Sequence, residues 1–277
     1  MRTELVGIMA ALDAFVEEER LIDKERHTIV ECSPKLYLNL VPLQNAFHPH
    51  ELIKLQESYH QEGKLLVHLW EDVWLFNQTG VLSRVKSFLG LNQTFHARKA
   101  KLVEVELAQA TEFFNAYHLQ GFVKAKYYYG LMVDHELITM ASFSDLRPMK
   151  FKGNHYTSAE LIRFASKEGY TVTGGLSKLI KHFMNLKKPN DLMSYADRDW
   201  SLGKAYDKLG FELTATTEPA HLFVDEKTRL RYFPHRLPKK VLLSFAGQKE
   251  LNLDEYLAKN GFVKVFNTGN LKYHLYV

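Results

Sequence analysis

Hydrophobic positions along the chain recur with two different spacings. In residues 4–22 apolar side chains follow one another at steps of three and four, which predicts an amphipathic helix. The segments 28–32 and 35–41 are short and rich in β-branched and aromatic residues. Pro34 separates them and Pro42 closes the second, so both are predicted strands.

The same alternation of elements continues to about residue 90. Pro49 begins a predicted helix that ends before Gly63. Residues 64–70 are predicted to form a compact apolar strand, and residues 79–89 a further helix. We therefore expect residues 1–92 to form a small α/β unit.

The central segment alternates strands with helices around two glycine-containing turns. Its predicted elements are, in order, a strand at 97–106, a helix at 109–118, a hairpin of 127–133 and 136–143, a strand at 160–166, a helix after Gly175, a strand at 192–196, a helix at 201–209, and strands at 211–216 and 220–224. This order predicts an α/β (α+β) fold in which helices flank a central mixed sheet, over residues 93–235.

The C-terminal residues 236–277 look like an extension that packs on this sheet or completes it. Residues 256–262 repeat the pattern of residues 206–211, in which a helix ends at a glycine and a strand follows. A generic helix–glycine–strand junction explains this similarity better than a true repeat. Residues 271–277 form a last predicted strand.

Composition narrows the class of protein. The chain has 277 residues, which suggests about two domains at ~150 residues each. With 46% hydrophobic and 25% charged residues, it is an ordinary globular sequence, which excludes collagen-like and disordered classes. Its single cysteine, Cys32, excludes an intramolecular disulfide framework and a cysteine-rich zinc site, so we expect a reducing compartment.

Charge and hydropathy bear on location and partners. Glu4 and Asp13 interrupt the N-terminal apolar stretch, which argues against a signal peptide. Apolar runs fall well short of the ~18 residues of a membrane span, so we expect a cytoplasmic protein with no membrane contact. The net charge of +4 permits a nucleic-acid partner without requiring one.

A glycine pair before a helix indicates a candidate anion site. Backbone N–H groups at a helix N-terminus bind phosphates, glycine lets the ligand approach the backbone, and a lysine neutralises its charge. The residues of this turn are Thr173, Gly174, Gly175, Leu176, Ser177 and Lys178. Simple turn geometry is the alternative explanation for such a pair.

A second motif gives this turn a family context. Residues 201–211 contain Ala–Tyr206–Asp–Lys–Leu–Gly–Phe, one strand after the glycine turn. Over residues 95–225 this order resembles the GNAT acyltransferase superfamily. The resemblance implies acetyl-CoA or another acyl-CoA on the turn, an amine acceptor, and Tyr206 as the acid that protonates the leaving thiolate. It also implies that the turn amides open into a cleft that Tyr206 faces; a core tyrosine is the alternative.

Polar residues near this predicted site are candidates for the acceptor side. His118 ends the first central helix and is a candidate base. The candidate substrate-binding residues are Tyr117, Arg163, Asp197 and Arg198. The alternative is structural: His118 only ends its helix, and Arg163 pairs with Asp197.

Longer stretches resemble phage and mobile-element proteins described as homing endonucleases. They include 97–99, 118–121, 130–138, 160–164, 174–179, 194–198 and 269–272. In those proteins a nuclease-like unit precedes a GNAT-like unit, and residues 65–74 are similar to a restriction-type nuclease core. Clustered carboxylates for Mg²⁺ are missing upstream, so we expect a non-cutting remnant with no metal. His68, Glu71 and Asp72 are expected to lie at a solvated strand end; weak metal binding by these three residues is the alternative.

The alternative function is non-catalytic nucleic-acid binding. Between Lys227 and Lys240 the chain carries many basic residues and no acidic ones, beside Tyr232 and Phe233. The candidate contacts are Arg229, Arg231, Arg236, Lys239 and Lys240. The sequence identifies neither the acyl group nor the acceptor, nor the oligomeric state.

Overall fold

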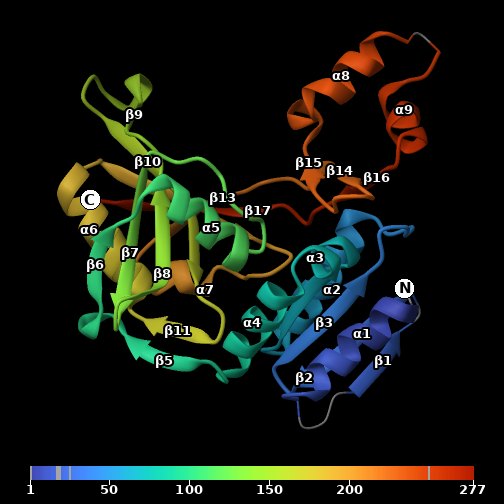
Figure 1. The fold of residues 1–277 in the computed structure, drawn as a ribbon, viewed down its shortest axis with the longest axis horizontal. Helices are drawn as coiled ribbons and strands as arrows, with labels where there is room; N and C mark the ends of the chain where they lie inside the picture. The colour runs from blue at the N-terminus through green and yellow to red at the C-terminus, as the bar shows by residue number, and fades with distance from the viewer. Residues whose placement is uncertain (1, 17–19, 25, 249) are drawn as a thin grey trace. The chain divides into compact units, whose positions relative to one another are not determined.

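The protein folds as two units, each assembled from three segments that are distant in sequence. A computed structural model describes residues 2–16, 20–24, 26–248 and 250–277 (Figure 1). The first unit comprises Met1–Gln78, Asp197–Ser201 and Thr217–Asn270; the second comprises Thr79–Ala196, Leu202–Thr216 and Leu271–Val277. This division differs from the contiguous blocks 1–92, 93–235 and 236–277, because residues 217–270 group with the N-terminal segment.

The first unit contains a four-stranded sheet in the order β1-β2-β3-β4. Helix α1 (Arg2–Asp13) precedes β1 (Arg20–Lys24), β2 (His27–Ser33) and β3 (Leu36–Val41), which pair antiparallel. Helix α2 (Pro49–Gln61) then crosses to β4 (Leu65–Trp70), which is parallel to β3, and α3 (Glu71–Phe76) follows. The strands at 28–32, 35–41 and 64–70 and the helix after Pro49 are confirmed.

The helix predicted over 4–22 is wrong in its second half. It ends at Asp13, where the backbone N–H groups of Phe15 and Val16 both donate to the Leu12 carbonyl and close the last turn. Strand β1 then pairs with β2, so hydrogen bonding to a neighbouring strand overrides the local helical pattern. Residues 17–19 of the predicted helix lie outside the described residues.

The C-terminal part of the first unit contains a three-stranded sheet. Its strands are β15 (Arg231–Tyr232), β14 (His221–Asp225) and β16 (Phe262–Phe266), with α8 (Lys239–Ala246) and α9 (Leu253–Lys259) between β15 and β16. Trp70 of β4 packs edge-on against Phe266, and Val41, Val224 and Val265 lie in the same buried cluster. One core therefore joins segments about 150 or more residues apart.

The second unit is built around a mixed sheet in the order β13-β17-β12-β10-β8-β7-β6, with β9 at the edge of β10. Its strands are β6 (Lys101–Glu104), β7 (Tyr127–Val133), β8 (Glu136–Phe143), β9 (Arg147–Pro148), β10 (Thr157–Ser166), β12 (Asp191–Asp197), β13 (Glu212–Thr216) and β17 (Asn270–Tyr276). Within this sheet β10 and β12 pair in parallel, whereas β8 pairs antiparallel with both β7 and β10. The predicted mixed α/β class is confirmed.

Helices cover both faces of this sheet. Phe143 of β8 stacks on Phe183 of α6 (Gly175–Lys187), with ring centroids 4.2 Å apart. Tyr128 of β7 lies in a separate buried cluster with Phe113 and Phe114 of α5 (Leu107–Tyr117). Because side chains alternate along a strand, Tyr128 and its neighbour Tyr129, which packs with the α6 cluster, point to opposite faces.

The remaining elements of the second unit flank the sheet. They are α4 (Gln78–Leu89), the parallel pair β5 (Gln93–His96) and β11 (Tyr170–Thr173), and the short α7 (Lys204–Asp207). The predicted strand 97–106 is broken by a 3-10 turn at Ala97–Lys99, and the predicted helix 201–209 is limited to four residues. In the described part of the chain no helix is long and apolar enough to cross a membrane.

Candidate active site

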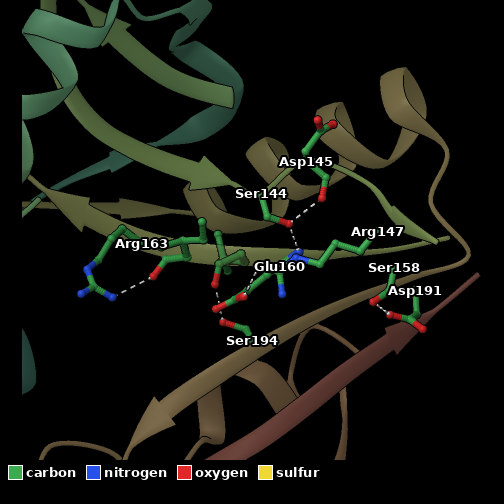
Figure 2. Close-up of polar contacts among 10 residues, drawn as sticks. Ser144, Asp145, Arg147, Ser158, Glu160, Arg163, Asp191 and Ser194 are labelled. Carbon is green, nitrogen blue, oxygen red and sulfur yellow. Dashed lines mark hydrogen bonds and ion pairs between the residues drawn. The ribbon is translucent and has the colours of Figure 1, made fainter. Parts of the chain in front are cut away.

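Two central strands of the second unit separate at a defined point. Strands β10 and β12 pair in parallel from Ser158 and Asp191 to Leu161 and Ser194, and among the described residues this pairing ends there. Both strands continue, β10 to Ser166 and β12 to Asp197. The point after Leu161 and Ser194 where the two strands separate is called the fork below. There the Ser194 hydroxyl donates to the Leu161 carbonyl at 3.0 Å (Figure 2).

A bulge in β10 changes the direction of the side chains beyond the fork. The register against β8 shifts between Leu161 and Arg163. Leu161 packs in the cluster with α6, whereas Ala165 packs in the cluster with α5. Without the extra residue both would face the same way, so the bulge turns Arg163 and Ala165 toward the α5 face.

Arg163 is held by backbone carbonyls on that face. Its Nε donates to the Gly121 carbonyl at 3.3 Å and its Nη1 to the Ile162 carbonyl at 3.1 Å. Figure 2 shows the guanidinium extending along β10, away from Glu160 and Arg147.

Tyr206 of α7 reaches the fork. Its hydroxyl lies 2.9 Å from Ser194 Oγ. Its ring stacks on that of Tyr273 in β17, with ring centroids 5.1 Å apart. It also contacts the Phe211 ring edge-on, with ring centroids 5.3 Å apart. Burial raises the pKa of Tyr206, with the Ser194 hydrogen bond and the Arg84 charge acting in the opposite direction. The phenol is therefore protonated at neutral pH and available as a proton donor.

His118 follows α5 and lies in a positive environment. Burial lowers its pKa well below its usual value, and the charges of Arg163 and Arg84 lower it further. Its Nδ1 accepts a hydrogen bond from the Gln120 backbone N–H at 3.1 Å. A neutral imidazole that accepts at Nδ1 carries its proton on Nε2. In this arrangement His118 presents a donor, whereas the predicted base requires the other tautomer.

The predicted glycine turn forms the start of α6 and one wall of a pocket. Gly174 is the N-cap with φ 75°, a conformation that favours glycine, and Gly175 begins the helix. The N–H groups of Gly175, Leu176 and Ser177 have no carbonyl one turn earlier within the helix. The pocket, of about 450 Å³, is lined by His96, Ala97, Arg98, Thr173, Gly174, Ser177, Lys178 and Lys181.

The ammonium group of Lys178 has a structural role in addition to its positive charge. Its Nζ donates to the carbonyls of Ala97 (2.9 Å) and Ala100 (2.7 Å), so it fixes the turn that breaks the predicted strand 97–106. One ammonium hydrogen stays available for a ligand. Tyr206 is not among the lining residues, so a cleft shared by the pocket and the phenol stays a prediction.

The other predicted substrate-binding residues are not gathered at one place. Tyr117 packs its ring against Phe113 within α5. Asp197 and Arg198 belong to the first unit. There the Asp197 carboxylate accepts from the Asp199 backbone N–H at 3.0 Å, and the Arg198 carbonyl accepts from Gln56 at 2.6 Å.

The basic segment predicted for nucleic-acid binding is not uniformly exposed. Arg231 makes two hydrogen bonds to the buried carboxylate of Asp72, at 2.5 and 2.8 Å, so this residue is a structural contact and the expectation that it faces phosphates is wrong. Arg229 is partly buried, with a φ of 60°. Arg236, Lys239 and Lys240 are exposed, and nucleic-acid binding by them stays a prediction.

The residues of the nuclease-like stretch form part of the first unit's core. His68 is fully buried, with its ring nitrogens 3.1 Å from Asn39 Nδ2 and 3.0 Å from the Leu52 carbonyl. Glu71 accepts from the Leu43 N–H at 2.9 Å, and Asp72 pairs with Arg231. The expected solvated strand end is therefore wrong. No group of three potential metal ligands is found among the described residues.

Comparisons with known proteins give distant likenesses. No family model matches the chain, and no curated protein matches it. Its structure is similar to a Bacillus subtilis acetyltransferase in complex with CoA (14% identity, 65% of this chain and 99% of that chain, TM-score 0.33). It is also similar to a GNAT family acetyltransferase of Elizabethkingia anophelis with acetyl-CoA bound (15% identity, 65% of this chain and 99% of that chain, TM-score 0.34).

A third solved structure with this likeness is a ribosomal-protein-S5-alanine acetyltransferase of Vibrio fischeri (12% identity, 64% of this chain and 93% of that chain, TM-score 0.34). The resemblance of residues 1–92 to a nuclease core stays a prediction.

Sequence reasoning missed several side chains that the fold brings to the fork and the pocket. They are Arg84, His96, Arg98, Lys181 and Ser194. His96 precedes the 3-10 turn Ala97–Lys99 and Arg98 lies within it, where the sequence predicts the start of a continuous strand. Ser194 offers a usable signal, because it is a lone hydroxyl at an inward position of an apolar strand.

Proposed function

We propose that the second unit is a GNAT-like acyltransferase that transfers an acyl group from acyl-CoA to an amine. The fork between β10 and β12 carries this proposal, because it combines a protonated phenol, hydrogen-bonded to Ser194, with the end of a parallel strand pair. The element order of the unit also agrees with the resemblance, since strand, helix, hairpin, strand, glycine-turn helix, strand, short helix and strand follow one another.

The pocket at the start of α6 suits the phosphates of CoA. Arg98 and Lys181 are exposed at its lining, Lys178 adds a third positive charge, and the first amides of α6 add the positive end of a helix dipole. Acidic side chains are not among its lining residues in the described chain. A pyrophosphate therefore finds donors and charge complementarity there.

The chemistry follows from the protonation states at the fork. Bound acyl-CoA supplies a thioester. The neutral acceptor amine forms the new C–N bond, the C–S bond breaks, and the Tyr206 hydroxyl gives its proton to the departing sulfur. The nitrogen, positively charged once the C–N bond has formed, loses one proton to water, and water returns one proton to the Tyr206 phenolate. Ser194 holds the phenol in position, because its Oγ links the Tyr206 hydroxyl to the Leu161 carbonyl.

Calorimetry with acetyl-CoA and with CoA tests the binding half of this proposal without knowledge of the acceptor. Arg98→Gln and Lys181→Gln are each expected to weaken binding by about tenfold, the effect of one lost charged contact. The matched control is Lys99→Gln, an exposed neighbour of Arg98 that does not line the pocket. Absence of heat at about millimolar ligand, where binding is worth about 4 kcal/mol, refutes the proposal.

Tyr206→Phe tests the chemical half. The variant keeps the ring that stacks on Tyr273 and removes only the hydroxyl. We expect unchanged affinity for CoA and a fall in kcat of about a hundredfold or more, the usual contribution of a positioned acid. An unchanged kcat excludes Tyr206 as the acid.

A further inference from the structure

The pocket at the start of α6 is built from two segments that contain no acidic residue. Residues 91–103 include β5 and the 3-10 turn, and residues 170–190 include β11 and α6. Asp and Glu account for 32 of the 277 residues of the chain, so their absence from both segments calls for an explanation. The same segments contain seven Lys and Arg residues: Arg98, Lys99, Lys101, Lys178, Lys181, Lys187 and Lys188.

The fold fixes the cations of the 3-10 turn next to the start of α6. Ala97 and Ala100 are buried, and their carbonyls accept from Lys178 Nζ at 2.9 and 2.7 Å. Arg98 and Lys99, which lie between the two alanines, are both exposed. Of these two, Arg98 lines the pocket. The turn therefore holds one cation at the pocket and a second one immediately outside it.

The outward face of α6 extends this positive surface away from the pocket. Lys181 lines the pocket, and Asn185 and Lys188 follow at steps of four and three, which places the three on one side of the helix. All three are exposed, and the neighbouring Leu186 is 55% exposed. An apolar side chain therefore lies within a basic surface.

The protein itself does not neutralise these cations. Among the described residues, every ion pair uses a cation other than Arg98, Lys99, Lys181 and Lys188. A phosphate bound in the pocket accounts for Arg98 and Lys181, which line it, but not for the two lysines outside it. Lys99 and Lys188 are thus in excess of what a small phosphate ligand needs.

Excess positive charge beside a phosphate pocket fits a large acidic partner that brings its own phosphate, because complementary charges steer such partners together. Single-stranded nucleic acid also stacks its bases on aromatic side chains, but residues 91–103 and 170–190, all of them described, expose no Phe, Tyr or Trp. Leu186 instead suits the mixed apolar and polar contacts of a protein interface.

We propose that an acidic carrier protein delivers the acyl group as a thioester on a phosphopantetheine arm, and that Lys99, Leu186 and Lys188 contact this carrier while the pocket binds the phosphate of the arm. The inference rests on the acyl transfer proposed above. The bond changes are the same: the amine nitrogen forms the C–N bond, the thioester C–S bond breaks, and the sulfur of the arm takes the Tyr206 proton. CoA contains the same arm, so the carrier adds protein contacts to a shared mode of binding.

Binding of a purified bacterial acyl carrier protein tests the proposal directly. Fluorescence anisotropy of the labelled carrier is measured for the holo form, for the apo form without the arm, and for a labelled single-stranded oligonucleotide. We expect the holo form to bind most tightly, and its Kd to rise as the salt concentration increases from about 50 to about 300 mM. Absence of holo-carrier binding, equal binding of the apo form, or tighter binding of the oligonucleotide overturns the inference.

Charge reversal outside the pocket assigns the contact to the named side chains. The double variant Lys99→Glu with Lys188→Glu is expected to weaken binding of the holo carrier about tenfold or more, and to leave the affinity for CoA unchanged. The matched control is Lys239→Glu with Lys240→Glu, which reverses two exposed lysines of the first unit. An unchanged carrier affinity, or an equal loss in the control, contradicts the assignment.

Calorimetry with CoA on the same preparations separates the two proposals. Bound CoA without carrier binding overturns only this inference. Failure of both donors to bind refutes the acyl transfer together with the carrier. Carrier binding that the double variant abolishes supports the docking surface, and it does so even where CoA itself does not bind.

Discussion

The ion pair between Asp72 and Arg231 is expected to hold the first unit together. Asp72 lies on α3 and Arg231 on β15, and the Asp72 side chain is 1% exposed against 21% for Arg231. Asp72→Ala leaves a largely buried guanidinium without its carboxylate, which costs roughly 3–5 kcal/mol for fully buried pairs. The residual exposure of Arg231 puts the expected loss near 3 kcal/mol.

Tryptophan fluorescence follows this unit selectively. All three tryptophans of the chain belong to the first unit: Trp70, Trp74 and Trp200. The guanidinium carbon of Arg231 lies 5.3 Å from the centre of the Trp70 ring. Urea unfolding monitored in this way gives the free energy of that unit. In a thermal scan, a loss of about 3 kcal/mol lowers Tm by roughly 6–12 °C.

A second substitution and a control make the result decisive. Arg231→Met in the Asp72→Ala background removes the stranded charge and is expected to restore much of the loss. Lys264→Ala breaks a pair whose two side chains are 45% and 49% exposed, and is expected to cost less than about 1 kcal/mol. A loss at Asp72→Ala no larger than that of the control refutes the reasoning.

Three further predictions concern single side chains. Burial, and then the Asp197 charge, raise the pKa of Asp199 to about 7, so the contribution of this carboxyl to stability is full below about pH 4 and is lost as pH rises through 7; Asp199→Asn is expected to remove this component of the pH dependence in urea unfolding. Gly203→Ala places a Cβ 1.9 Å from the Tyr273 hydroxyl and should cost more in Tm than Gly63→Ala, which has a similar φ and open space. Phe183→Ala should lower the free energy of unfolding by roughly 3–5 kcal/mol in a circular-dichroism denaturant titration, and a loss below about 1 kcal/mol would contradict its core position.

Local patterns determined the elements that the sequence predicted best. The hairpin of β7 and β8 follows from alternating side chains and from Asp134 and His135, which adopt φ values of 49° and 66° in its turn. The α6 turn follows from its glycine pair. Both junctions that end in glycine, at Gly210 and Gly261, adopt the positive φ expected of such helix ends.

Contacts between distant residues account for what the sequence left open. The break at residues 97–100 depends on Lys178, some 80 residues later, and the orientation of Arg163 depends on a bulge that alternation alone does not reveal. The pairing of Asp72 with Arg231 spans 159 positions and makes the basic segment part of a core. Such contacts form only in the folded chain, so neither periodicity nor motif spacing indicates them.

The position of β17 has a consequence for synthesis. This strand lies inside the sheet of the second unit, between β12 and β13, yet a ribosome makes it after the whole of residues 217–269, which fold into the other unit. Until then β12 and β13 have a gap between them, and the ring of Tyr206 lacks the Tyr273 surface on which it stacks. A nascent chain therefore assembles the first unit's C-terminal sheet before the fork is finished, and removal of β17 would leave the facing edges of β12 and β13 unpaired.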